Sequence, residues 1–161
     1  MAKFVSEKIK MKTESRLAAV QATYMIAFGQ LPVDQVIKDF QDGNVGRFVI
    51  EEDTDTQQEE MVEVNNMDKA YFEQLVRGVQ KNKEALEKSL HLYLAEGYSF
   101  ERMDGTLQAL LLCAIYEIIN TQDVDANVLI KEYVDLAYAF FSKKEPKMVN
   151  ALLDKIAKEV R

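Results

Sequence analysis

The sequence has little of the residue types from which most catalytic and metal sites are built: one cysteine, one histidine and no tryptophan in 161 residues. Cys113 alone excludes an intrachain disulfide and a metal cluster of several cysteines, so we expect a small buried side chain. His91 is the one residue around which a catalytic triad or a histidine metal site would have to be built. Because its neighbours, SLHLYL, look like a helix surface, we expect a structural histidine there.

Helix breakers are also scarce, with two prolines and six glycines. At 48% hydrophobic and 29% charged residues, the composition predicts an all-α protein with about seven helices. No apolar run approaches the roughly 18 to 20 residues of a membrane helix, and no apolar signal-peptide stretch follows the basic N-terminus. We therefore expect a cytoplasmic protein without a membrane partner.

A glycine loop for phosphates is missing as well, because Gly43 and Gly46 lack the strand, lysine and helix of a P-loop. Paired carboxylates such as Glu132 and Asp135 are typical of a solvated helix face. These absences predict a protein that is not an enzyme and that needs neither a cofactor nor a metal.

The two signs of charge are distributed unevenly. Residues 1–16 hold five basic and two acidic side chains, and residues 143–161 hold six basic and three acidic ones. Within a net charge of −7, the intervening chain therefore holds nine basic against 22 acidic residues. From the residues alone, each basic end is most simply a solvated cluster, whereas two ends folded together would form one positive patch.

The first part of the chain predicts two helices behind a mobile basic arm, residues 1–13. Thr13 or Ser15 is a suitable N-cap for the first helix, which has one buried stripe. Pro32 opens a shorter helix, VDQVIKDFQ.

An acidic segment follows at about residues 43–66. Together with the first helices it forms the region of residues 14–66. Residues 51–63 hold seven carboxylates and no basic residue. We expect a largely disordered loop, with FVI at 48–50 as a brief extended piece. A calcium site is disfavoured because the spacing and glycine of a calcium loop are missing.

Residues 67–161 predict the remaining helices. The first part runs from Met67 to about Leu94, with a bend between Gly78 and residues 81–83. Three further helices are expected to begin at Ser99 or Asp104, at Asp123 or Asp125, and near Pro146.

One carboxylate stands out in the most apolar segment, LLLCAIYEII at 110–119. At 100° per residue, Glu117 shares a stripe with Cys113 and Asn120, beside the leucine-rich arc. We expect it at the rim of a mostly buried helix. There it would make a hydrogen bond or ion pair with a neighbouring helix, and direct contact with a protein partner is the alternative.

From Ser15 onward the chain resembles the family of the transcription antitermination factor NusB in four segments. RLAAVQATY at 16–24 is similar to the pattern R-x-x-A-x-Q-x-L-Y, and YFEQLVRGV at 71–79 to a segment with an aromatic pair, a leucine and a late glycine. LLLCAIYEI at 110–118 resembles L-R-x-A-x-Y-E-L. The segments VLIKEYVDLAYAF and KMVNALLDKI, within 128–156, resemble I-N-E-x-V-E-L-A-K and F-V-N-G-V-L-D.

The resemblance implies an all-α fold of two small packed helical bundles within one domain, residues 1–161. It implies a non-catalytic protein that pairs with NusE, a protein of the small ribosomal subunit, and binds the boxA sequence of nascent RNA. The pair helps to assemble an antitermination complex on RNA polymerase, notably during ribosomal RNA transcription. In this family the two chain ends approach one RNA-facing surface, which favours a single basic patch.

The family comparison also gives the expected site residues. Those expected to bind RNA are Lys8, Lys10, Lys12, Arg16, Lys144 and Lys147, and those expected to contact a protein partner are Tyr116 and Glu117. The first three lysines stand where arginines are usual, which preserves the charge but not the bidentate contact.

Departures from the family pattern reduce the basic surface. Leu112 and Tyr138 replace basic residues, and Met148 replaces an aromatic residue able to stack on a base. With the acidic segment, they predict weak, salt-dependent RNA binding in the absence of NusE.

Other functions are left open. One alternative is a helical protein-binding module of the same fold that docks NusE or other partners with little or no sequence-specific RNA binding. A less favoured one is the related domain of a ribosomal RNA methyltransferase, which a nucleotide-binding region would be expected to follow. Self-association into a homodimer also stays open.

Overall fold

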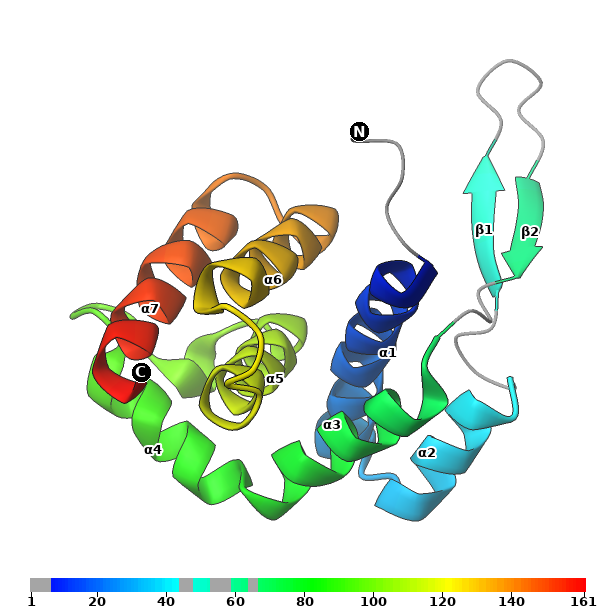
Figure 1. Ribbon diagram of the computed structural model, residues 1–161, viewed down its shortest axis with the longest axis horizontal. Coiled ribbons are helices and arrows are strands. Elements are labelled where there is room, and N and C mark those ends of the chain that lie inside the picture. The colour runs from blue at the N-terminus through cyan, green and yellow to red at the C-terminus, as the bar shows by residue number, and fades with distance from the viewer. Residues whose placement is uncertain (1–6, 44–47, 53–58, 64–66) are drawn as a thin grey trace. The chain divides into compact units, whose positions relative to one another are not determined.

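A computed structural model describes residues 7–43 and 67–161, and the backbone of 48–52 and 59–63 (Figure 1). Within these residues there are seven α-helices, a short 3-10 helix and two strands. The predicted all-α class is confirmed, because helices form the core. The chain divides into two compact units, residues 1–73 and 74–161, and the boundary lies inside helix α3.

In the first unit, α1 (Glu7–Gly29) packs against α2 (Val33–Gln41). A nine-residue helix is marginal on its own, so α2 depends on the apolar face that it buries. Phe40 on that face meets Phe72 of α3 (Lys69–Lys81) with 5.3 Å between ring centroids. Burying one such ring contributes about 1.5–3 kcal/mol. The predicted second helix, VDQVIKDFQ, is confirmed, and Pro32 stands at its N-cap position.

Helix α1 begins earlier than the sequence predicted. Residues 7–12, assigned to the mobile arm, are helical, and Thr13 and Ser15 lie inside the helix rather than at its N-cap. Their hydroxyls instead donate to backbone carbonyls one turn earlier, at 3.1 and 2.8 Å. Serine and threonine satisfy their hydroxyls in this way inside helices, so they were misleading cap signals here. Residues 1–6 of the predicted arm lie outside the described residues.

Ser15 also joins α1 to the start of α3. Its Oγ accepts a hydrogen bond from the backbone N–H of Asp68 at 2.8 Å. Asp68 Oδ1 in turn accepts from the N–H of Tyr71 at 3.1 Å, as a helix-capping carboxylate does. These bonds hold Tyr71 beside α1.

The acidic segment contains a short antiparallel ladder where the sequence predicted a loop. Strand β1 (Phe48–Glu52) pairs with β2 (Glu59–Glu63), and Val49 lies opposite Val62. The loop expectation is wrong for these two stretches, and FVI is part of a longer strand. Their aromatic and β-branched residues favour the ladder, although two of its pairs place glutamate opposite glutamate, which opposes pairing. Residues 53–58 lie outside the described residues.

The second unit is built around the most apolar helix. Its elements are the end of α3, α4 (Lys83–Tyr93), the 3-10 helix η1 (Phe100–Arg102), α5 (Gly105–Asn120), α6 (Ala126–Phe140) and α7 (Lys144–Val160). Helix α5 contacts α4, α6 and α7, as Figure 1 shows. Ten of its sixteen residues are buried, as expected for a helix that is apolar on all sides.

Local signals set the ends of these helices as predicted. Asp104 caps α5 and Asp125 caps α6, and each carboxylate accepts the backbone N–H two residues later at 2.8 Å. Pro146 lies buried in the first turn of α7. The predicted bend is a break at Asn82, whose side chain donates to the carbonyl of Gly78 at 2.8 Å.

Gly78 lies directly under the ring of Tyr116. A Cβ added at this glycine would be 2.1 Å from Cζ of Tyr116 and 2.3 Å from its hydroxyl oxygen. A side chain at this position would force the ring to move, so the close packing of α3 on α5 favours glycine here.

Glu117 is buried rather than at a rim. Its side chain is 1% exposed, and Tyr133 of α6, which is fully buried, donates its hydroxyl proton to Oε2 at 2.5 Å. The rim position is therefore wrong, and the predicted hydrogen bond with a neighbouring helix is confirmed. A buried carboxylate is stable only with such donors.

Arg161 ties the end of α7 to the turn after α5. Its guanidinium donates to the carbonyls of Ile118, Val124 and Thr121 at 2.9, 2.5 and 2.8 Å. A cation is favourable at the end of a helix because it offsets the exposed carbonyls.

Candidate nucleic-acid interface

The three lysines predicted to bind RNA near the N-terminus lie on the first two turns of α1. Lys8 and Lys10 are exposed and Lys12 is half-buried. At 100° per residue, Lys8 and Lys12 share a face with Arg16, whereas Lys10 lies about 200° from Lys8. Lys10 Nζ is 3.9 Å from a carboxylate oxygen of Glu7, an exposed and weak contact. The fold thus brings three of these four residues to one face and separates Lys10 from them.

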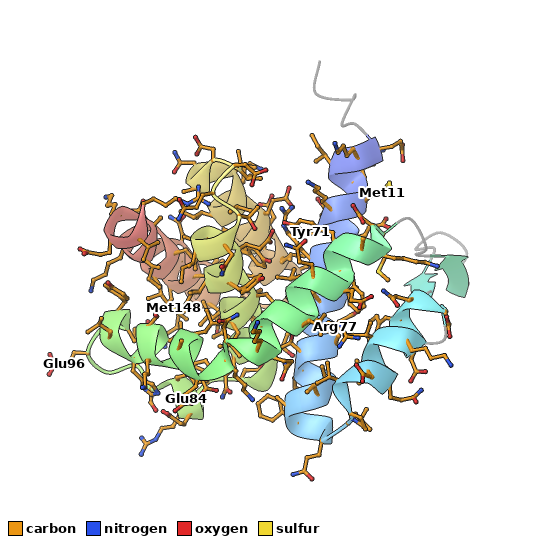
Figure 2. All side chains as sticks on the ribbon, turned by 60° about the horizontal axis from the view of Figure 1, so that its bottom comes forward. Met11, Tyr71, Arg77, Glu84, Glu96 and Met148 are labelled. Atoms are coloured by element: carbon orange, nitrogen blue, oxygen red, sulfur yellow. The ribbon has the colours of Figure 1, made fainter. Side chains whose placement is uncertain are left out.

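Arg16 is not an open contact. Only 4% of it is exposed, and Nη2 donates to the hydroxyl of Tyr71 at 3.2 Å. The guanidinium carbon lies 5.5 Å from the ring centroid of Tyr71, and Lys12 Nζ lies 5.0 Å from the same centroid. Cations within about 6 Å of a tyrosine face are attracted by the ring. Tyr71, labelled in Figure 2 near the start of α3, is therefore in contact with two cationic side chains of α1.

The second set of predicted residues lies at the start of α7, in the second unit. Lys144 and Lys147 are exposed, and the structure gives neither an ion-pair partner among the residues it describes. Lys143 precedes them at the N-cap position without a side-chain capping bond. Cations at the positive end of a helix reduce its stability slightly. An anionic ligand would explain their placement better than helix stability does.

Two hollows flank α7. The first, which we name the α4–α7 groove, has a volume of about 500 Å³. It is lined by Tyr93, Leu94, Ala95, Tyr98, Lys144, Lys147, Met148, Ala151, Leu152 and Lys155. Met148, labelled in Figure 2, is half-buried within it.

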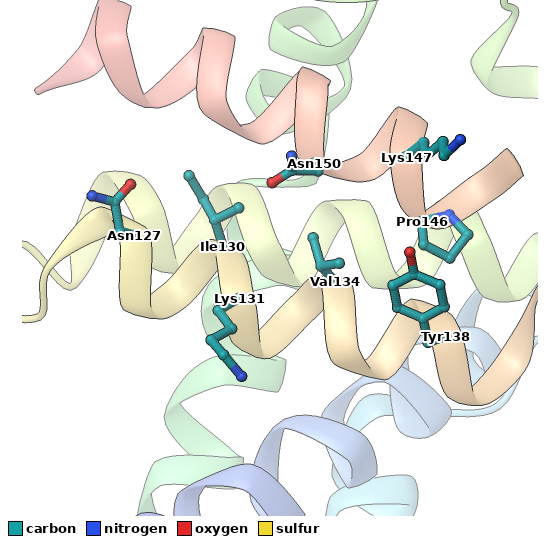
Figure 3. A pocket seen from close by; sticks show the side chains of 8 residues that line it. All are labelled: Asn127, Ile130, Lys131, Val134, Tyr138, Pro146, Lys147 and Asn150. Atoms are coloured by element: carbon teal, nitrogen blue, oxygen red, sulfur yellow. The ribbon is translucent and has the colours of Figure 1, made fainter. Parts of the chain in front are cut away.

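The second hollow, the α6–α7 groove, has a volume of about 310 Å³ and is shown in Figure 3. Ile130, Val134 and Pro146 form its apolar part, the amide of Asn127 lies at one end, and that of Asn150 lies near the middle. The remaining lining residues are Lys131, Tyr138 and Lys147. Lys131 is 3.2 Å from Asp135, which partly offsets its charge.

The two positions that lack the basic residue of the family pattern differ in consequence. Leu112 is 2% exposed, so a basic residue there would be buried in α5 rather than offered to RNA. Tyr138 is 54% exposed and presents its ring in the α6–α7 groove. The first substitution therefore removes no exposed charge from this structure.

The two predicted partner contacts are unequally placed. Tyr116 is half-buried, and its ring packs against Gly78. Glu117 is buried and bonded to Tyr133, so its carboxylate has no open face for a partner.

Sequence reasoning gave no role to Tyr71, Tyr93 or Tyr98. Tyr71 lies in a segment that was singled out, but its contact with Arg16 joins residues 55 positions apart. The only available signal was an aromatic residue next to a predicted helix start, which is common in cores.

The other titratable groups have simple surroundings. Cys113 is buried, as predicted. His91 is exposed on α4 and lies 2.8 Å from Glu101. In the described part of the chain, no group of three His, Cys, Asp or Glu side chains is arranged to hold a metal ion. Nor is any described helix both long and apolar enough to cross a membrane.

Comparison with known proteins identifies the family of the chain. Residues 13–158 match the NusB family. The chain is 36% identical over 152 residues to the transcription antitermination protein NusB of Novosphingobium aromaticivorans, with 94% of this chain and 96% of that protein covered. It is 37% identical over 153 residues to the protein of that name from Rhodospirillum rubrum, covering 91% of this chain and 83% of that one.

A solved structure shows the same fold. It is T. maritima NusB, with a TM-score of 0.71 and 24% identity over 91% of this chain and 90% of that one. Antitermination is a binding function rather than a catalysed reaction, which agrees with the expectation that the chain is not an enzyme. The chain belongs to the NusB family of transcription antitermination proteins.

Proposed function

We propose that this protein pairs with NusE, binds boxA in nascent ribosomal RNA and helps to assemble the antitermination complex on RNA polymerase in the cytoplasm. The observation that carries the proposal is the face of α1 that holds Lys8 and Lys12. The chain that carries it belongs to a family of transcription antitermination proteins. Lys8 is exposed and Lys12 is half-buried, and lysine side chains at a surface are suited to hold phosphates.

In our proposal the cationic residues have different roles. Lys8 and Lys12 contact phosphates, and Lys10, on the other side of α1, adds attraction at a distance. Arg16 is a positioning residue, because its guanidinium is buried and bonded to the hydroxyl of Tyr71. Lys144 and Lys147 hold further phosphates at the start of α7.

Sequence preference requires more than these lysines. A lysine is a point charge that attracts every phosphate, whereas base reading needs groups aimed at base edges or faces. We therefore propose that the preference for boxA arises mainly in the pair with NusE. Tyr116, which is half-buried, is the partner contact that we retain from the sequence prediction, and we leave out Glu117 because it is buried.

The test is a competition between boxA RNA and a scrambled RNA of the same composition, with and without NusE, at two salt concentrations. We expect the pair to prefer boxA, and binding to weaken steeply as salt rises. NusE binding without a preference for boxA would instead identify a protein-docking module. No RNA shift at low salt would refute RNA binding altogether.

Two further measurements refine that result. Lys147→Glu should weaken the boxA shift because it places a carboxylate among the α7 lysines, while Lys158→Glu on the same helix serves as the control. The mass of the free protein in solution, measured first, shows whether a homodimer competes with the pairing with NusE.

A further inference from the structure

The α4–α7 groove combines features that suit one kind of ligand. The residues that line it include three lysines, Lys144, Lys147 and Lys155, but no aspartate or glutamate. Two tyrosines and a methionine supply flat or polarisable apolar surface beside this charge. Its volume of about 500 Å³ lies in the range of pockets that enclose small organic groups.

The groove is held open by local structure. Tyr98 is the last residue of a turn, which is closed by a hydrogen bond of 3.1 Å from the N–H of Tyr98 to the carbonyl of Ala95. Gly97 within the turn has a φ of +93°, which favours glycine. On the other wall, Lys155 Nζ lies 3.4 Å from the carbonyl of Tyr93 at the end of α4. The aromatic and the cationic parts are therefore both positioned before a ligand arrives.

The spacing of the lysines indicates more than one anionic group. From Lys144 to Lys155 the helix axis advances about 16 Å at 1.5 Å per residue. A single phosphate cannot serve both ends of such a row. Consecutive phosphates of a single strand, with an unstacked base between them, meet the charge and the apolar surface together.

We infer that the α4–α7 groove holds one unpaired base of the bound RNA against Tyr98 and Met148, with Lys144, Lys147 and Lys155 on the flanking phosphates. This inference rests on the proposed RNA binding and adds to it a base subsite and two residues, Tyr98 and Lys155. Tyr98 is 41% exposed, so its ring is open to a base. Because stacking accepts any base, the subsite adds affinity rather than sequence preference.

The experiment uses the full chain and a series of single-stranded boxA RNAs, each of which carries 2-aminopurine at a different unpaired position. We expect its fluorescence to be quenched at one position, and the quenching to be lost in Tyr98→Ala but kept in Tyr98→Phe. The affinity of Tyr98→Ala should fall at least about fivefold. Lys155→Gln should reduce the slope of log affinity against log salt by about 0.7, the value for one phosphate of a single strand. Lys158→Gln, one turn further along α7 and paired with Asp154 at 3.1 Å, should leave the slope unchanged.

The outcomes separate this inference from the proposed function. RNA binding that is unaffected by Tyr98→Ala and Lys155→Gln overturns the base subsite and leaves the proposed function standing. No RNA binding by the wild-type protein at low salt overturns both. If a polyglutamate peptide depends on Tyr98 and Lys155 while RNA does not, the groove belongs to an acidic protein partner and the inference is wrong.

Discussion

Replacing Gly78 by alanine tests how closely α3 packs on α5. The new Cβ would lie 2.1 Å from Tyr116 Cζ, while ordinary contact begins near 3.4 Å, so the ring has to move by roughly 1.3 Å. Overpacking of this depth belongs at the upper end of the usual range, about 3 kcal/mol. Alanine is better than glycine inside a helix by about 1 kcal/mol. We therefore expect a net loss of about 2 kcal/mol in the free energy of unfolding.

The same substitution should change sign when the ring is absent. In a Tyr116→Ala background the overlap disappears and only the helix preference remains, so Gly78→Ala should stabilise the protein by about 1 kcal/mol. The two effects differ by about 3 kcal/mol, the upper end of couplings measured between residues in contact.

Urea unfolding followed by far-ultraviolet circular dichroism measures both effects. With a slope of about 2 kcal/mol per molar urea, the midpoint of Gly78→Ala should fall by about 1 M, and that of the double variant should rise relative to Tyr116→Ala. The packing argument is wrong if Gly78→Ala has the same sign in both backgrounds.

Three further predictions concern single groups. Tyr133→Phe removes a donor from buried Glu117 and should lower the free energy of unfolding by about 1.5–3 kcal/mol; an unchanged urea midpoint would contradict it. Arg161→Ala removes three hydrogen bonds to carbonyls, but the side chain is exposed. Thermal unfolding should therefore show that the free energy of unfolding falls by no more than about 1 kcal/mol, and a larger fall would contradict the argument that exposed bonds contribute little. The pKa of Glu101 is lowered, chiefly by a hydrogen bond from its own backbone N–H and then by Ser99 and His91. Its contribution to stability is present above the ordinary glutamate pKa and is lost as pH falls through the lowered one. In a carboxyl NMR titration Glu101 should titrate below an ordinary exposed glutamate, and an equal or higher value would contradict this.

Helix ends could be predicted where one residue sets them locally. Asp104 and Asp125 cap helices with their own side chains, and Pro32 fits only before or within a first turn. The start of α1 was mispredicted because Thr13 and Ser15 are equally suited to bond the preceding turn inside a helix. The strands were missed because the carboxylates of the acidic segment outweighed its short runs of β-formers.

The candidate site was predictable in charge but not in exposure. Clustered lysines identified both ends of the chain, and Lys8 and Lys144 are exposed as an RNA contact requires. Buried Arg16 is bonded to Tyr71, and buried Glu117 is bonded to Tyr133, and in both cases the partner lies on another helix. Periodicity alone assigns a residue to a face, whereas the packing of other helices decides whether that face is open.

The lysines of α1 provide the most direct test of the claim that they hold RNA phosphates. Lys8 and Lys10 are both exposed and lie on the same two turns of α1, but only Lys8 shares a face with Lys12. The measurement is the salt dependence of boxA affinity for the pair with NusE, compared between Lys8→Gln and Lys10→Gln. Lys8→Gln should reduce the slope of log affinity against log salt by about 0.7, while Lys10→Gln should reduce it clearly less. Equal slopes for the two variants, or a larger change for Lys10→Gln, would contradict the proposed interface.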